Sequence, residues 1–120
     1  MLRILVVDDN ASFRRVFSRA LDHEPDFEVV GQADSLTQAR ANRLEGIDVA
    51  IIDRRLPDGD GLELIGELRE ASSGAKVFMM SAVMEPVQPR EAQKVGVDGV
   101  IDKLASPEEI AAQIRAARDG

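Results

Sequence analysis

The sequence predicts an α/β domain in which a five-stranded parallel sheet lies between two layers of helices. Short apolar runs of four to six residues alternate along the chain with segments whose apolar residues recur every three or four positions. The runs are continuous, as in strands that are buried on both faces. The chain has 120 residues, 44% of them hydrophobic, which suits a single packed core.

Five runs of mostly apolar residues are the predicted strands. They are Arg3 to Val7, Phe27 to Gly31, Asp48 to Asp53, Lys76 to Met80 and Gly99 to Asp102. After the third run, the Pro, Asp and Gly residues of Leu56 to Gly61 predict a loop. Strict alternation of strands and helices, joined by right-handed crossovers, favours a doubly wound sheet with the flavodoxin-like strand order 2-1-3-4-5.

Helix signals separate the first four strands. Ser12 is the expected N-cap of the first helix. The apolar face of that helix consists of Phe13, Val16, Phe17, Ala20 and Leu21. A capping box of Ser35 and Gln38 opens the second helix, and Gly46 is expected to close it. The third helix is expected over Leu62 to Arg69.

Proline marks the last two helices. Pro86 and Pro89 predict a short fourth helix that starts late, near Pro89, because proline is tolerated only in the first turn. The segment Ser106-Pro107-Glu108-Glu109 combines an N-cap, a proline at the first helical position and a Glu at the third. Ile110 and Ile114 then give the last helix its buried stripe.

Charge and composition exclude several classes of function. The formal net charge of −7 disfavours direct nucleic-acid binding, which needs clustered Lys and Arg. The absence of cysteine excludes disulfides and thiolate metal sites. No apolar run approaches the ~20 residues of a membrane helix, so we expect a soluble, cytoplasmic protein without membrane contact. We expect one domain over residues 1–120, with the start of a linker at 118–120.

Polar side chains lie at the ends of four predicted strands. Asp8 and Asp9 follow the first, Asp53 ends the third, Ser81 follows the fourth and Lys103 follows the fifth. Taken singly, each has an ordinary explanation as a helix cap, a turn residue, a hydroxyl bonded to the backbone or a solvated lysine. Ligands of open parallel sheets bind beyond the carboxyl ends of the strands, and the order 2-1-3-4-5 brings all five side chains to that edge. Their joint occurrence predicts a functional site.

The residue types of this site favour metal-assisted phosphoryl chemistry. Three carboxylates held close together repel one another, and a divalent cation removes the repulsion. Hard oxygen ligands suit Mg²⁺ (or Mn²⁺), which keeps several waters and takes one or two carboxylates. Lys103 and Ser81 are suited to the oxygens of a transferred phosphoryl group. A carboxylate can itself act as the nucleophile and form an acyl phosphate.

In order and spacing, these motifs resemble the receiver domain of two-component response regulators. The matching segments are Val6-Val7-Asp8-Asp9-Asn10, Ile51-Ile52-Asp53, Leu56-Pro57-Asp58-Gly59-Asp60-Gly61, Met79-Met80-Ser81-Ala82, Gly96-Val97-Asp98-Gly99 and Asp102-Lys103. The resemblance covers nearly the whole chain, from Arg3 to about Arg118. It implies a flavodoxin-like receiver that switches conformation when phosphorylated and then controls a partner or an output domain.

The resemblance also implies the phosphoacceptor and the metal ligands. Asp53 would accept the phosphoryl group from a phosphohistidine on a sensor histidine kinase or a phosphotransfer protein. Asp9, Asp53 and the backbone carbonyl of Arg55 would ligate Mg²⁺, and Asp8 would help through water or a direct contact. Such a domain is not a turnover enzyme, although it would dephosphorylate itself.

Three further residues would receive the phosphoryl group. Ser81 would move to bind one of its oxygens, Lys103 would pair with it, and the small Ala82 would leave the site accessible. The chain departs from the family pattern at Val100, three residues before Lys103, where the family usually has Tyr or Phe. It also has Leu104 where the family often has Pro, so a trans peptide is expected there.

The departure at Val100 concerns the face through which many receivers dimerise or meet their targets. That face is formed by the fourth helix, the fifth strand and the last helix. In the usual picture the aromatic residue swings inward as the hydroxyl residue moves, and a valine cannot act in the same way. We therefore expect a non-standard output face. The simpler alternative is that Val100 only fills core space.

Three alternatives stay open. A phosphatase of the haloacid-dehalogenase type has its Asp nucleophile on the first strand and a second Asp two residues later. Counting from Asp8 or Asp9, that position is Asn10 or Ala11. The second alternative is a receiver-like interaction module that works without phosphorylation. The intact set of polar residues at the strand ends argues against it. The third is the receiver half of a transcription factor whose DNA-binding half lies outside this sequence.

Overall fold

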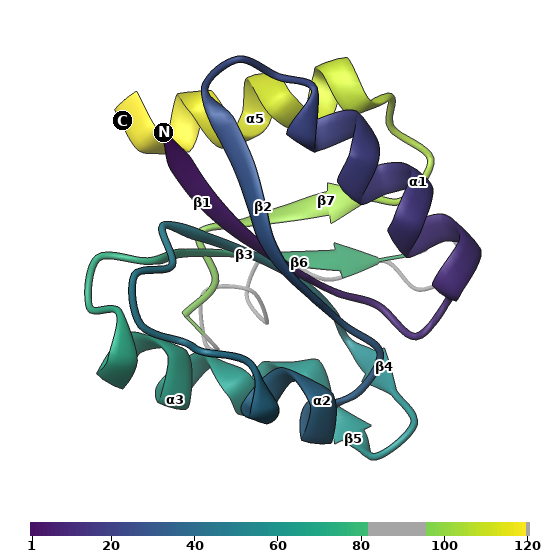
Figure 1. Ribbon diagram of the computed structural model, residues 1–120, viewed down its shortest axis with the longest axis vertical. Coiled ribbons are helices and arrows are strands. Elements are labelled where there is room, and N and C mark those ends of the chain that lie inside the picture. The colour runs from purple at the N-terminus through teal and green to yellow at the C-terminus, as the bar shows by residue number, and fades with distance from the viewer. Residues whose placement is uncertain (82–95, 120) are drawn as a thin grey trace.

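The computed structural model describes residues 1–81 and 96–119 of the chain. Within these residues the main sheet has five parallel strands (Figure 1). In spatial order they are β2 (Phe27–Ala33), β1 (Leu2–Val7), β3 (Val49–Asp53), β6 (Lys76–Ser81) and β7 (Gly99–Asp102). A separate antiparallel hairpin, β4 (Arg55–Leu56) and β5 (Gly59–Asp60), lies between β3 and β6 in the chain. The main sheet therefore confirms the predicted order 2-1-3-4-5.

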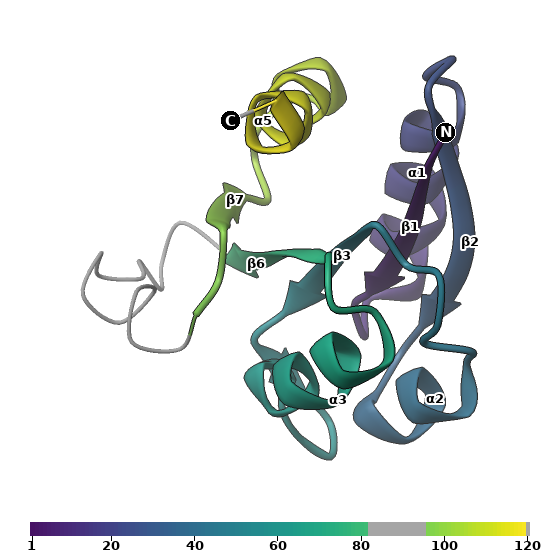
Figure 2. The same ribbon diagram turned by 90° about the vertical axis from the view of Figure 1, so that its left-hand side faces the viewer.

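Helices cover both faces of the sheet and complete three layers (Figure 2). The helices α1 (Ala11–Asp22) and α5 (Pro107–Asp119) pack on one face. On the other face lie α2 (Leu36–Ala41) and α3 (Leu64–Ala71), the latter preceded by the 3₁₀ turn η1 (Gly61–Glu63). Ala82 and the fourth helix expected near Pro86 and Pro89 lie outside the described residues.

The strands are buried on both sides, which explains their continuous apolar runs. On β1, Ile4 and Val6 belong to the core shared with α1 and α5, while Leu5 and Val7 belong to the core shared with α2 and α3. All four side chains are at most 1% exposed. Successive side chains of a strand point to opposite faces, so the central strands β1, β3 and β6 contribute to both cores. The sheet is thus a rigid support for the residues at its edges.

The structure corrects two expectations about α1. Its N-cap is Asn10, whose Oδ1 accepts a hydrogen bond from Phe13 N at 3.0 Å, and not Ser12, which lies inside the first turn. Asn and Ser cap helices about equally well, so only the path of the chain decides between them. Val16 is 71% exposed rather than part of the apolar face, because the helix turns Phe17 and Leu21 most deeply into the core.

The second helix is shorter than expected. Ser35 is its N-cap as predicted, and its Oγ accepts a hydrogen bond from Gln38 N at 3.1 Å. The Gln38 side chain accepts from Asp34 N rather than from Ser35. The helix ends at Ala41 with Asn42 as C-cap, so Gly46, with a φ of 74°, does not close it and lies in the following loop. The backbone of Asn42 is extended, with φ of −75° and ψ of 155°, so the helical conformation does not continue past Ala41.

The remaining described elements follow the prediction with small shifts. The loop expected after β3 contains the β4–β5 hairpin, and η1 delays the start of α3 from Leu62 to Leu64. Ser106 Oγ accepts a hydrogen bond from Glu109 N at 3.1 Å, as expected of the last helix cap. Ile110 and Ile114 are each 1% exposed. The described residues contain no cis peptide bond. No helix among them has both the length and the apolar character to cross a membrane.

Candidate functional site

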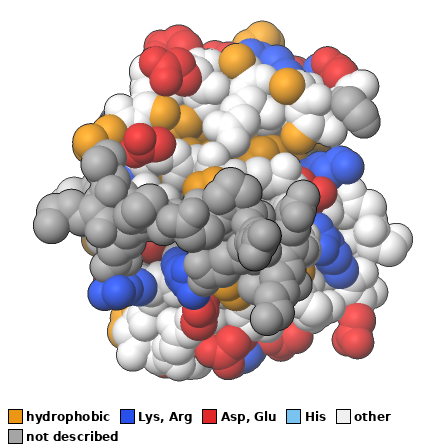
Figure 3. Space-filling model, turned by 180° about the vertical axis from the view of Figure 1, so that it is seen from behind, with side chains coloured by type: hydrophobic (Ala, Val, Ile, Leu, Met, Phe, Trp, Pro, Cys, Tyr) orange, Lys and Arg blue, Asp and Glu red, His pale blue; other side chains and the backbone are white. Residues whose placement is uncertain are grey.

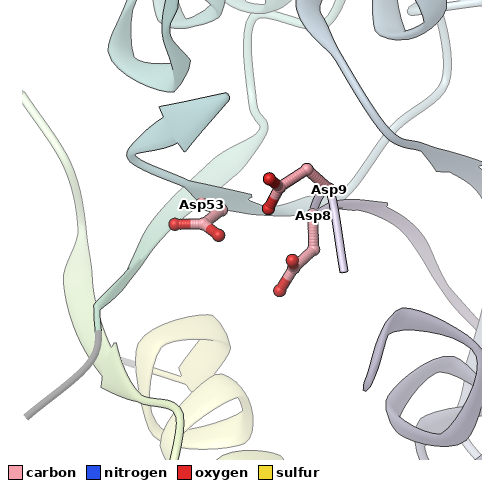
Figure 4. A group of neighbouring side chains, drawn as sticks. All are labelled: Asp8, Asp9 and Asp53. Atoms are coloured by element: carbon pink, nitrogen blue, oxygen red, sulfur yellow. The ribbon is translucent and has the colours of Figure 1, made fainter. Parts of the chain in front are cut away.

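Three aspartates meet at the carboxyl ends of β1 and β3 (Figure 4). Asp8 and Asp9 follow β1 directly, and Asp53 is the last residue of β3. One carboxylate oxygen from each lies within 4.8 Å of the others. Asp8 is 0% exposed and Asp53 is 8% exposed, whereas Asp9 is exposed. The parallel pairing of β1 with β3 therefore brings together the three carboxylates that the sequence predicted as a group.

Hydrogen bonds hold Asp8 in place. Its Oδ1 accepts from Asn10 N at 2.9 Å, and its backbone carbonyl accepts from Arg14 Nη1 at 2.7 Å. Its backbone N–H donates to the carbonyl of Ala33 on β2. No sequence pattern singles out Arg14, a half-buried residue in the first turns of α1. Its role becomes visible only because α1 begins beside Asp8 and turns this side chain back toward it.

Lys103 joins two of the carboxylates. It follows β7, and its Nζ lies 2.8 Å from Asp53 Oδ2 and 3.0 Å from Asp8 Oδ2. Burial by itself would lower the pKa of Lys103, but its close contacts with the carboxylates of Asp53 and Asp8 outweigh that effect and raise the pKa. The ammonium also lies 5.3 Å from the centre of the Phe13 ring. The structure therefore places Lys103 beside the carboxylates of Asp53 and Asp8.

The other predicted residues border this cluster to different degrees. Ser81 ends β6, half-buried, one position beyond the residue that pairs with Asp53. Its carbonyl accepts a hydrogen bond from Lys103 N at 3.1 Å. Arg55 begins β4, and its N–H lies 3.4 Å from Asp53 Oδ1. Val100 pairs with Met79 within the sheet and is half-buried.

The backbone of Asp53 is enclosed by a glycine. Gly61, at the start of η1, packs so closely that a Cβ there would collide with the carbonyl oxygen of Asp53 and would lie 2.6 Å from Cγ2 of Ile52. Gly61 N also donates to the carbonyl of Arg54 at 2.7 Å. The glycine of the Leu56–Gly61 motif thus permits the close approach of two backbones beside the acidic cluster.

The donor set fits a hard divalent cation. In the described part of the chain, the three carboxylates of the cluster lie beside the ammonium group of Lys103, which is ion-paired with two of them. Asp8 Oδ2 is buried and, among the described residues, has the Lys103 ammonium at ion-pair distance but no aligned hydrogen-bond donor. Such an atom can accept a further hydrogen bond from water or bind a cation. Carboxylate oxygens in this number suit Mg²⁺ or Mn²⁺.

The fold and the cluster define a class of protein. The model of the response regulator receiver domain family matches residues 4–115, and the chain belongs to this family. One relative is the transcriptional regulatory protein UhpA of Escherichia coli K12, which is 31% identical over 121 residues. That alignment covers all of this chain and 60% of UhpA, so the chain spans little more than half the length of such curated relatives.

Solved structures agree with this assignment. The signal receiver domain of NarL from Mycobacterium tuberculosis has a TM-score of 0.76 and 30% identity, covering 98% of this chain and 96% of that chain. A structure of the P1 domain of CheA3 in complex with CheY6 from R. sphaeroides has a TM-score of 0.79 and 26% identity, covering 99% and 98%. The resemblance to response regulator receivers predicted from sequence is therefore confirmed.

Proposed function

We propose that this chain is a phosphoacceptor switch in which Asp53 takes a phosphoryl group from a phosphohistidine on a sensor histidine kinase or a phosphotransfer protein. One observation carries the proposal. Lys103 Nζ lies between Asp53 and Asp8, at 2.8 and 3.0 Å, and Asp9 completes a group of three carboxylates beside it. A nucleophilic carboxylate, a fixed cation and further oxygen ligands are the groups that phosphoryl transfer to an aspartate requires.

The contacts of Asp53 suggest how it would react. Lys103 holds Oδ2, whereas the hydrogen bond of Oδ1 within the described residues is the 3.4 Å contact with the N–H of Arg55. Oδ1 is therefore the oxygen better placed to attack phosphorus. The new O–P bond forms as the N–P bond of the phosphohistidine breaks, and the electron pair of that bond returns to the imidazole. Lys103 and, after a movement, Ser81 would bind the phosphoryl oxygens. Hydrolysis of the acyl phosphate would later reset the domain.

The proposal includes Mg²⁺ (or Mn²⁺). Asp9, Asp53 and the backbone carbonyl of Arg55 would hold it, with Asp8 assisting through its buried Oδ2, for which the described residues supply no hydrogen-bond donor. When bound, the cation would offset the negative charge that gathers on the phosphoryl oxygens. Asn10 and Arg14 would contribute indirectly, because they fix both the carboxylate and the backbone of Asp8.

Two exposed hydrophobic side chains support a protein donor. Val16 is 71% exposed on α1, one turn beyond Phe13, whose ring contacts Lys103. Leu104 is 79% exposed and follows Lys103 directly. Contiguous exposed apolar surface marks protein contacts, and Val16 and Leu104 are, with Met1, the large hydrophobic side chains exposed among the described residues. We infer that the donor contacts both, so Val16→Asp and Leu104→Asp should slow phosphorylation by a protein donor but leave acetyl phosphate as effective as before. Equal slowing with both donors would contradict this role.

The output is proposed from the relatives. This chain would be the cytoplasmic receiver unit of a bacterial two-component system, and its signal would pass to a partner, a second copy or an output domain. UhpA is described as a transcriptional regulatory protein, which favours a DNA-binding output. The half-buried Val100 favours a switch that differs from the usual aromatic movement. NMR comparison of the apo form with the beryllofluoride–Mg²⁺ form tests this, and a shift of β7 as in ordinary receivers would contradict it.

The rival functions have less support. The family match argues against a haloacid-dehalogenase phosphatase. The positions two residues after Asp8 and Asp9 are Asn10 and Ala11, so neither aspartate is followed by a second carboxylate at the spacing of that class. A phosphorylation-independent module would not need the ion-paired set of Asp8, Asp53 and Lys103.

Phosphorylation of the purified chain tests the central proposal. After incubation with acetyl phosphate and Mg²⁺, intact mass should increase by one phosphoryl group, and the gain should be absent in Asp53→Asn. Asp48→Asn is a matched control, because Asp48 precedes β3 at the opposite edge of the sheet and accepts a hydrogen bond from Arg3 N. A wild-type chain that gains no mass, or an Asp53→Asn variant that still gains it, would refute the assignment.

A further inference from the structure

The hairpin that follows Asp53 is held at its tip by the second helix. Its strands pair Arg55 with Asp60 and Leu56 with Gly59, which leaves Pro57 and Asp58 as the turn. The hairpin begins two residues after the phosphoacceptor candidate and contains Arg55, the candidate carbonyl ligand of the cation. Any movement of the hairpin would therefore move one side of the acidic cluster.

The carboxylate of Asp58 forms the contact with α2. Its Oδ1 accepts a hydrogen bond from Leu36 N at 2.8 Å. Its Oδ2 accepts from Thr37 N at 2.9 Å and from Thr37 Oγ1 at 2.7 Å. These hydrogen bonds, that from the Thr37 side chain first, lower the pKa of Asp58 to about 2. The carboxylate thus remains charged over the physiological range and satisfies two N–H groups at the start of the helix.

The base of the hairpin is held separately. Gly61 N donates to the carbonyl of Arg54 at 2.7 Å, and Asp60 N donates to Glu63 Oε2 at 3.0 Å. Asp60 Oδ1 in turn accepts from Leu62 N in the capping box of η1. The base is therefore attached to the backbone beside Asp53 and to η1, while the tip is attached to α2. Residues between two such anchors have little freedom to move.

We propose that Asp58 is a positioning residue for the cation site: by fixing the hairpin tip to α2, it sets the position of the Arg55 backbone relative to Asp53. The inference rests on the proposed function, because it assigns Asp58 a part in cation binding. Asp58 itself lies at the far end of the hairpin and is exposed. A residue of this kind acts through the geometry of the ligand set.

Mg²⁺ affinity distinguishes positioning from a purely structural role. The Kd for Mg²⁺ would be measured on the full chain by NMR titration, with thermal unfolding followed in parallel. Supporting groups around metal sites typically change affinity by about 10- to 100-fold when removed, and we expect about tenfold weaker binding for Asp58→Asn. Thr37→Val removes only the 2.7 Å hydrogen bond and should weaken Mg²⁺ binding to a smaller extent. The double variant should be no weaker than Asp58→Asn alone, because both changes act on one contact.

Asp22→Asn is the matched control. Asp22 also accepts a hydrogen bond from a backbone N–H, that of Val29 at 2.9 Å, but joins α1 to β2 away from the acidic cluster. The Asp22→Asn substitution should leave the Mg²⁺ affinity unchanged. If Asp58→Asn and Thr37→Val lower the melting temperature but leave the Kd unchanged, the positioning role is overturned. If the wild-type chain binds no Mg²⁺ at all, the proposed cation site is wrong and this inference is overturned with it.

Discussion

Replacing Asp9 with asparagine should make the metal-free chain more stable. Asp9 is exposed, and one of its oxygens lies within 4.8 Å of an oxygen of Asp8 and one of Asp53. Lys103 is ion-paired with both of those carboxylates, so Asp9 faces about one net negative charge. Two unit charges at this distance repel by about 0.9 kcal/mol in bulk water and by about 3.5 kcal/mol at an effective dielectric constant of about 20.

Solvent exposure places Asp9 near the lower of these values. We therefore expect the free energy of unfolding to rise by about 1 kcal/mol, or the melting temperature by about 4 °C, in the presence of a chelator. Circular dichroism is the appropriate probe, because the chain has neither Trp nor Tyr. Mg²⁺ at about ten times its Kd should stabilise the wild type by about 1.4 kcal/mol and the variant by less, since a ligand has been lost.

The contrast between the two conditions makes the test specific. Glu28→Gln removes the same charge from an exposed position on β2 and makes the net charge of −7 less negative by the same amount, but it is expected to bring no gain in stability. The reasoning is refuted if Asp9→Asn lowers the melting temperature in chelator, because Asp9 would then be a net stabilising group. It is refuted equally if Mg²⁺ stabilises wild type and variant by the same amount.

Further predictions concern the surroundings of the site. Gly61→Ala should destabilise the chain by about 1–3 kcal/mol and slow phosphorylation, because the new Cβ would collide with the backbone of Asp53. Gly66→Ala meets open space and should instead stabilise the chain by about 0.5–1 kcal/mol, because alanine is the better helix former. Urea unfolding measures both changes in stability. Asp58 has a pKa lowered to about 2 from 3.8, so its stabilising contribution is present above 3.8 and lost as the pH falls toward 2. The stability difference between wild type and Asp58→Asn should shrink over that interval, and a difference that grows instead would contradict the assignment. Arg115→Met removes a 2.6 Å ion pair between α5 and Asp26, so it should lower the melting temperature more at low salt than at high salt.

Local capping was predicted only in part. Ser106 and Ser35 cap their helices as expected, because each precedes a clear helical pattern. Ser12 was the wrong cap for α1, since Asn10 is an equally good capping residue and the chain turns into the helix sooner after β1. The apolar periodicity of α1 also placed Val16 on the buried face, but its side chain is exposed in the structure. Periodicity identifies a helix but leaves the direction of its buried face uncertain by about one residue.

Contacts between segments that are distant in the chain could not be predicted from the sequence. Asp58 was predicted as part of a loop, but its hydrogen bonds reach residues that lie 21 and 22 positions earlier in the chain. The sequence of α1 gives no sign that Arg14 donates a hydrogen bond to the carbonyl of Asp8. Neither contact has a local signal, because both depend on how two elements pack against each other.

The sequence by itself determined the strands, their order and the side chains at their ends. Continuous apolar runs require strands covered on both faces, and alternation with helices leaves few topologies, so Asp8, Asp9, Asp53 and Lys103 had to come to one edge. Only the tertiary structure decided how these side chains meet. Lys103 reaches Asp53 across 50 residues of chain and pairs with Asp8 as well, while one buried oxygen of Asp8 finds no hydrogen-bond donor among the described residues. Such distances depend on the packing of β1, β3, β6 and β7 side by side, which fixes backbone positions to within a fraction of an ångström that no sequence pattern specifies.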